Sequence, residues 1–201
     1  MKRTMLTVLL FVSFSLWTHA QVLTKIDDVA PLQEDLVGVK KGDAWGFINT
    51  DGELVIDYRN DVVSTSAHYP VFNDGLCLIQ EKKDGITYFG YMNAKGDIAI
   101  PAEYLAATPF ENGYARVIKH YEIETSTTNA LGKRIVNYSY NELLINTKNK
   151  TIQHLQGPHH LLFDANAIKA NPPVITSKLI GDDLIAVRKK DNTYTIYKLE
   201  D

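Results

Sequence analysis

Residues 45–56 and 89–100 repeat one another almost position for position. Each stretch is an aromatic-Gly-aromatic segment, followed by an Asn-x-x-Gly turn and a second apolar segment. A turn of this kind between two apolar segments encodes a short β-hairpin. Because self-similarity at a fixed interval is the signature of repeat architectures, we expect an all-β protein built from antiparallel β-hairpin repeats of about 40 residues.

A second pattern recurs four times and marks the start of each repeat. An apolar anchor residue leads through an acidic or amide turn into a strand, on which two apolar positions lie two residues apart. That spacing is typical of the buried face of a sheet, so Cys77 in the first of these positions is expected to pack in the core. The anchors are Leu32, Phe72, Phe110 and Ile180; the first apolar column is Val37, Cys77, Ala115 and Ile185, and the second is Val39, Ile79, Val117 and Val187.

The anchors divide the chain after residue 20 into one β domain of four repeats. With 45% hydrophobic and 22% charged residues, the 201-residue chain has the composition of an ordinary globular protein. The domain spans residues 21–201, and its repeats cover residues 32–71, 72–109, 110–179 and, as a partial copy, 180–201.

The third repeat is the longest and departs most from the motif. Asn149 takes the place of Gly52 and Gly96 in the turn, and Leu143 and Leu144 replace the aromatic-Gly pair. Residues 118–140 form an insertion of alternating polar and apolar residues, which predicts an extended hairpin leaving the sheet. Helical periodicity is weak and confined to residues 164–170.

The ends of the chain leave two architectures open. The fourth repeat stops after two strands, and residues 22–26 are apolar enough to supply the missing one. In that case the four units close into a propeller-like ring and hide both sheet edges. The alternative is an open β-repeat array, because units of this length suit either architecture.

A secretory signal peptide is expected over residues 1–20. Lys2 and Arg3 precede an apolar run over residues 5–17, which ends at Thr18-His19-Ala20. This predicts cleavage before Gln21. The run is too short to cross a bilayer, and no Cys follows it to carry a lipid, so we expect a periplasmic or secreted protein with no stable membrane insertion after cleavage.

Charge gives no reason to expect a nucleic-acid partner. Loss of Lys2 and Arg3 changes the formal net charge from −3 to −5. A mildly acidic protein has no electrostatic attraction to nucleic acid or to anionic lipid.

The motif residues resemble those of the WG-repeat family, also called KWG repeats. The resemblance covers residues 36–117, and its signature is Trp45-Gly46-Phe47, Phe89-Gly90-Tyr91 and the strand from Gly113 to Val117. It implies an all-β repeat array of a kind common in bacteria and often exported. It implies no activity, because the family has no shared catalytic residues.

Residue patterns indicate no catalytic, cofactor-binding or metal-binding residue. Nucleophile-elbow, phosphate-loop, H-E-x-x-H and Cys-x-x-Cys motifs are missing from the sequence. His154, His159 and His160 lie close together in a predicted loop, but neighbouring histidines on an extended chain point to opposite sides, which favours an exposed polar loop over a metal site. The repeated aromatic residues are expected in the core, whereas a sugar-binding row would need them exposed.

Three functions remain open from the sequence. The first is a non-catalytic binding module of the bacterial cell envelope, in which the hairpin over residues 118–140 and a long loop over residues 156–173 contact a protein or glycan partner. The second is an envelope polymer hydrolase, and the third is a purely structural envelope protein. The sequence does not name the binding residues or the partner.

Overall fold

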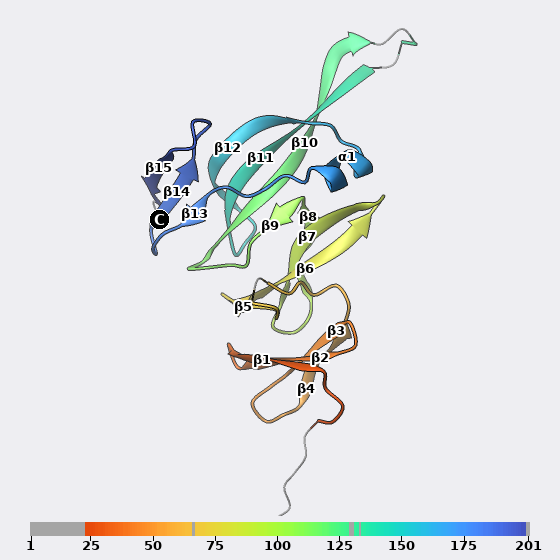
Figure 1. Ribbon diagram of the computed structural model, residues 1–201, viewed down its shortest axis with the longest axis vertical. Coiled ribbons are helices and arrows are strands. Elements are labelled where there is room, and N and C mark those ends of the chain that lie inside the picture. The colour runs from red at the N-terminus through yellow and green to blue at the C-terminus, as the bar shows by residue number, and fades with distance from the viewer. Residues whose placement is uncertain (1–22, 66, 129–130, 133, 200–201) are drawn as a thin grey trace, which may run out of the picture.

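The computed structural model describes residues 23–65, 67–128, 131–132 and 134–199, so the predicted signal peptide lies outside the described residues. The chain forms four antiparallel sheets; the first three follow one another in chain order along the long axis, and the fourth lies beside the third (Figure 1). We call each sheet with its loops a unit. The first unit holds β1 (Asp28–Gln33), β2 (Leu36–Lys41), β3 (Ala44–Ile48) and β4 (Leu54–Arg59); the second holds β5 (Phe72–Asn73), β6 (Leu76–Lys83), β7 (Ile86–Asn93) and β8 (Ile98–Tyr104). The third holds β9 (Ala106–Ala107), β10 (Tyr114–Thr128), β11 (Arg134–Asn146) and β12 (Thr151–Leu161), and the fourth holds β13 (Lys178–Leu179), β14 (Leu184–Arg188) and β15 (Tyr194–Lys198), with helix α1 (Ala165–Ala170) between the two.

The array is open, so of the two architectures that the sequence left open the open β-repeat array is confirmed and the propeller-like ring is wrong. Within the described part of the chain β15 pairs with β14 alone, and residues 23–26 form no strand. The segment that follows them, β1, pairs with β2 and so begins the first sheet instead of completing the last. The first and fourth units accordingly lie far apart along the molecule (Figure 1). The expectation of an all-β repeat array is confirmed.

The second hairpin of each four-stranded unit is closed by the same turn. In the first unit the Asn49 side-chain oxygen accepts the backbone N–H groups of Asp51 and Glu53, at 3.1 and 2.9 Å. Asn93 and Asn146 make the same pair of hydrogen bonds in the second and third units. The fourth turn residue has a positive φ in each case, +83° at Gly52, +84° at Gly96 and +61° at Asn149. Asn149 therefore replaces glycine because asparagine tolerates the left-handed conformation.

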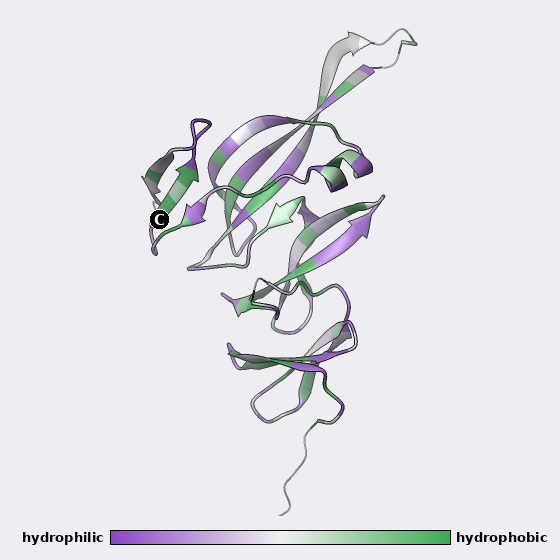
Figure 2. Ribbon diagram, in the orientation of Figure 1, coloured by the Kyte–Doolittle hydropathy of each residue, from purple (hydrophilic) through white to green (hydrophobic). Residues whose placement is uncertain are grey.

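The hydrophobic core lies between the sheets, so a stacked sheet buries both of its faces. In Figure 2 apolar and polar residues alternate along many of the strands. One cluster joins the first unit to the second, another the second to the third, and another the third to the fourth. Six of the eight column residues predicted from the sequence lie in these clusters and are at most 3% exposed: Cys77, Ala115, Ile185, Ile79, Val117 and Val187. Val39 is 2% exposed, and Val37 is partly buried.

Burial makes the Cys77 thiol unreactive in the folded protein. The side chain is 0% exposed, and burial raises the pKa of the thiol to about 12. Because the thiolate is the reacting species, we expect no alkylation by iodoacetamide at pH 8 in buffer and complete alkylation in urea, measured by intact mass. Rapid labelling under native conditions would contradict the burial of Cys77.

Strand pairing corrects the sequence alignment of the third and fourth repeats by one residue each. Trp45 pairs with Lys40, and the position equivalent to it in the third unit is Glu142, paired with Ile118. Leu143 therefore stands at the glycine position and Leu144 at the position of Phe47. In the fourth unit Leu179, and not the predicted Ile180, pairs with Ile185, because the turn that follows is one residue longer.

The anchors of the second, third and fourth units pack on the preceding sheet. The Phe72 ring meets the Phe47 ring edge-on, with centroids 5.0 Å apart and planes at 86°. Phe110 meets Tyr91 in the same way at 4.7 Å and 63°. At the third junction Leu179 packs against the cluster that contains Leu144. One apolar contact is thus made three times by equivalent positions.

Hydrogen bonds between turns reinforce the stacking on one side of the array. The Glu34 carboxylate accepts the N–H of Gly75 at 2.9 Å, and the Asp74 carboxylate accepts the N–H of Gly113 at 2.8 Å. At the third junction the Asn112 amide donates to the Asp182 carboxylate at 3.0 Å. The acidic or amide residues of the anchor turns therefore connect each unit to the next.

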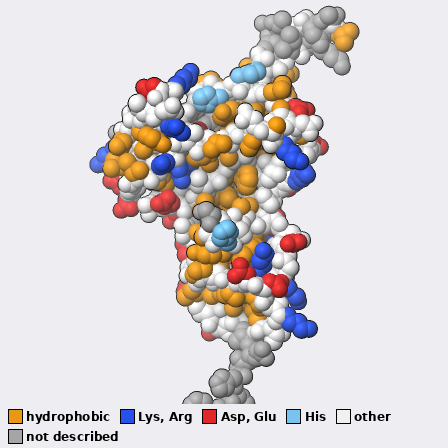
Figure 3. All heavy atoms as spheres, viewed as in Figure 1, with side chains coloured by type: hydrophobic (Ala, Val, Ile, Leu, Met, Phe, Trp, Pro, Cys, Tyr) orange, Lys and Arg blue, Asp and Glu red, His pale blue; other side chains and the backbone are white. Residues whose placement is uncertain are grey.

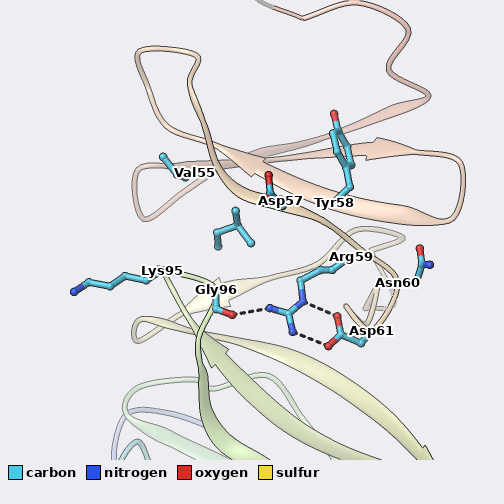
Figure 4. A pocket seen from close by; sticks show the side chains of 9 residues that line it. Val55, Asp57, Tyr58, Arg59, Asn60, Asp61, Lys95 and Gly96 are labelled. Carbon is cyan, nitrogen blue, oxygen red and sulfur yellow. Dashed lines mark hydrogen bonds and ion pairs between the residues drawn. The ribbon is translucent and has the colours of Figure 1, made fainter.

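A further contact lies at the ends of β4 and β8. Arg59 donates to the carbonyl of Gly96 at 2.7 Å and forms an ion pair with Asp61 at 2.6 Å (Figure 4). Both contacts lie in an open cavity of about 610 Å³ between the first two units. Tyr104, at the position of Arg59, donates to the side chain of Asn149 at 2.5 Å in the next unit. This cavity therefore holds a structural contact between units.

Candidate binding surface

The hairpin formed by β10 and β11 extends beyond the sheets (Figure 1). In the first two units the equivalent hairpins close at the pairs Lys41–Ala44 and Lys83–Ile86. In the third unit the pairing continues as far as Thr128–Arg134, with an irregularity after Glu124. The extended hairpin predicted over residues 118–140 is therefore present.

Four aromatic rings stack at the root of this hairpin. Tyr138 on β11 stacks on Phe163, with ring centroids 4.6 Å apart, and His120 on β10 stacks on the same ring at 4.6 Å. Tyr88 from the second unit lies against His120 at 5.8 Å. These contacts fix the direction in which the hairpin leaves the array, since they join it both to the α1 side and to the neighbouring unit.

His120 acts in this stack as a neutral ring. Burial lowers the pKa of the imidazole, and the charge of Lys119 lowers it further. Within the described residues its Nδ1 has no hydrogen-bond partner. At neutral pH the side chain is therefore uncharged and contributes mainly ring contacts.

Glu142 fixes the segment that connects α1 to β13 by hydrogen bonds. We call residues 171–177, which connect α1 to β13, the strap. The Glu142 carboxylate is 3% exposed and accepts four hydrogen bonds: from Thr176 N at 3.1 Å, Thr176 Oγ1 at 3.0 Å, Ser177 N at 2.9 Å and Ser177 Oγ. Arg116 also donates to the Ser177 carbonyl at 2.5 Å.

Trp45, at the equivalent position of the first unit, also bonds to the segment that follows its sheet. Its indole N–H donates to Ser64 at 3.1 Å.

The strap and the hairpin root enclose a pocket of about 520 Å³. Polar and apolar groups contribute about equally to its lining. Leu162 is 69% exposed and Val174 68% exposed at this site. A concave site with this mixed lining suits a ligand group that has both an apolar face and hydrogen-bonding atoms. The lining residues are Tyr140, His160, Leu161, Leu162, Ala167, Asn171, Pro172, Pro173, Val174 and Thr176.

The three histidines lie on a strand, so the predicted loop is wrong here. His154, His159 and His160 belong to β12 and pair with Leu143, Tyr140 and Ser139. The strand continues because the extension of β11 supplies a partner that the other units lack. Among the residues that the structure describes, no three His, Cys, Asp or Glu side chains are placed to hold a metal ion.

The long loop predicted over residues 156–173 is also much shorter than expected. Its first part belongs to β12, and residues 165–170 form α1, where the weak helical periodicity was noted. Asp164 caps this helix by accepting the N–H groups of Asn166 and Ala167.

Aromatic residues of the motif are mainly in the core, as expected. Trp45 and Phe47 are each 2% exposed and Tyr91 is 0% exposed. Phe89, at the position of Trp45, is partly exposed and lines two neighbouring pockets of about 580 and 400 Å³, the second of which borders α1. Phe89 is thus the aromatic motif residue best placed to touch a ligand.

Comparison with known proteins agrees with this architecture. The fold defines an open β-hairpin repeat protein. A family model described as WG containing repeat matches residues 45–59 and 89–121, so the chain contains WG repeats in its first, second and third units. No curated protein and no solved structure shows significant similarity to the chain. In the part of the chain that is described, no helix is long and apolar enough to span a membrane.

Proposed function

We propose that this WG-repeat protein is an exported, non-catalytic binding module of the bacterial cell envelope. The observation that carries the proposal is the β10–β11 hairpin, which extends well beyond the point where the equivalent hairpins of the first two units close. A long insertion in an otherwise regular array is the position where binding residues are commonly placed on a rigid scaffold.

The root of the hairpin supports a contact with a partner in two ways. The aromatic stack and the Glu142 hydrogen bonds order the surface beforehand, so a ligand need not pay for ordering it. The pocket beside it offers apolar surface at Leu162 and Val174 together with the polar groups of His160 and Asn171. This chemistry fits a protein segment with an apolar side chain, or a sugar ring with its hydroxyl groups.

A crosslinking pull-down from the native envelope tests the proposal with two variants and a control. The first variant replaces residues 124–136 by Asp-Gly, the turn that joins β6 to β7, and so keeps the Ile123–Asn137 pair and the aromatic root. The second is Leu162→Asp in the pocket. Ile98→Asp, at a residue 61% exposed on the second unit, is the matched control.

The expected result is one crosslinked partner with the wild type and the control, and loss of that partner with both variants. Retention of the partner by the hairpin-shortened variant would contradict the proposal. Release of sugar or peptide fragments from envelope polymer by the wild type would favour the hydrolase alternative and would also contradict it.

Export makes a separate prediction. Cleavage before Gln21 is expected from the sequence, and the intact mass of the protein recovered from the periplasm or medium should correspond to residues 21–201. Recovery of a chain that retains Met1 in the cytoplasmic fraction would contradict export.

A further inference from the structure

The fourth unit exposes the apolar residues that the other units bury against a neighbour. By strand pairing, Tyr194 and Ile196 occupy the positions of Trp45 and Phe47. Tyr194 is 45% exposed and Ile196 59% exposed, whereas Trp45 and Phe47 are each 2% exposed. Figure 3 shows apolar side chains gathered over the sheet of β13 to β15. Among the residues that the structure describes, no unit covers this face as the second unit covers Trp45 and Phe47.

The first unit exposes the complementary half of the same contact. Val29 and Leu32 occupy the positions of Val62 and Phe72, because they pair with the equivalent residues of β2 and β6. Val29 is 58% exposed and Leu32 57% exposed, whereas Val62 is 8% and Phe72 2% exposed. Elsewhere in the array the anchor at this position is buried against the preceding sheet, as Phe72 is on Phe47.

The two exposed surfaces match, and they lie on units too far apart to meet within one chain (Figure 1). We propose that a second copy of this chain docks head to tail, with Leu32 of one copy packing on Ile196 of the other. The contact would continue the series Phe47–Phe72, Tyr91–Phe110 and Leu144–Leu179 across the boundary between molecules. Because such an interface is heterologous and the array is open, the association extends into chains of molecules instead of stopping at a dimer.

Sedimentation velocity over a range of concentrations tests the proposal. The sample is the protein purified in the form that the cell produces after any processing. The wild type is expected to form dimers and longer species as the concentration rises. Leu32→Asp and Ile196→Asp are each expected to be monomeric, with association weakened roughly 30-fold or more, since a charge is placed in an apolar contact. Both side chains are more than half exposed, so folding should survive, and far-UV circular dichroism provides the check.

Mixing the two variants separates head-to-tail docking from other modes of association. Leu32→Asp keeps an intact fourth unit, and Ile196→Asp keeps an intact first unit, so an equimolar mixture should form a 1:1 dimer and nothing longer. In a symmetric dimer that uses only one of the two surfaces, only the variant in that surface would lose association. Mixing it with the other variant would not restore its association. Each of three results would overturn the proposal: this symmetric pattern, a mixture that stays monomeric, or a wild type that is monomeric at all concentrations.

Discussion

Trp45→Ala is expected to lower the free energy of unfolding by about 3–5 kcal/mol, the cost of deleting a buried aromatic side chain. Trp45 is 2% exposed and belongs to the cluster that joins the first unit to the second. Its removal therefore leaves a cavity at a junction and also removes the hydrogen bond to Ser64. Urea denaturation measures the change.

Tyr194→Ala provides the matched control because Tyr194 occupies the same register position in the fourth unit. The ring is 45% exposed, so at a concentration where the protein is monomeric the change should be within about 0.5 kcal/mol. Equal effects of the two substitutions would show that Trp45 does not contribute through burial at a junction.

Glu142→Ala is expected to cost about 3–4 kcal/mol, because it leaves the N–H groups of Thr176 and Ser177 without their acceptor in a buried site. Glu142→Gln should cost less, since its single carbonyl oxygen can still accept two of the four hydrogen bonds. Glu53→Ala, at an exposed carboxylate, is the control and should change stability by about 0.5 kcal/mol or less.

Loss of the Glu142 contacts should also release the strap. Hydrogen exchange of the Thr176 and Ser177 amides is therefore expected to accelerate strongly in Glu142→Ala and little in Glu53→Ala. An unchanged urea midpoint together with unchanged exchange would contradict the role of Glu142.

Features encoded by adjacent residues could be predicted from the sequence. The Asn-x-x-Gly turns are local, because the Asn side chain bonds to the backbone two and four residues later. The apolar columns follow from the period of two along a strand, and with them the burial of Cys77. The glycine after the aromatic residue is likewise explained: a Cβ at Gly90 would lie 2.5 Å from the Ile100 carbonyl oxygen.

Features that depend on a distant partner could not be predicted. Whether the units close into a ring depends on the angles between sheets, which no local pattern encodes. The strand character of His159 and His160 depends on the length of β11, and the register of Leu179 depends on one additional residue in the turn that follows it.

Glu142 was missed for a similar reason. An acidic residue in a strand ordinarily indicates an exposed position, and its partners Thr176 and Ser177 lie 34 and 35 residues away in the sequence. The available signal was the turn: seven residues separate Trp45 from Gly52, and the same interval before Asn149 places Glu142 in the column of Trp45. Strand pairing confirms that place.

A double-mutant cycle on Phe47 and Phe72 tests most directly whether the units are held together by anchor contacts. Phe47→Leu, Phe72→Leu and the double variant are compared by urea denaturation, with Phe47 and Phe110, which belong to different junctions, as the control pair. We expect a coupling free energy of about 0.5–1.5 kcal/mol for Phe47 with Phe72 and none beyond error for the control pair. Additive effects of Phe47→Leu and Phe72→Leu would contradict the stacking of the array through this contact.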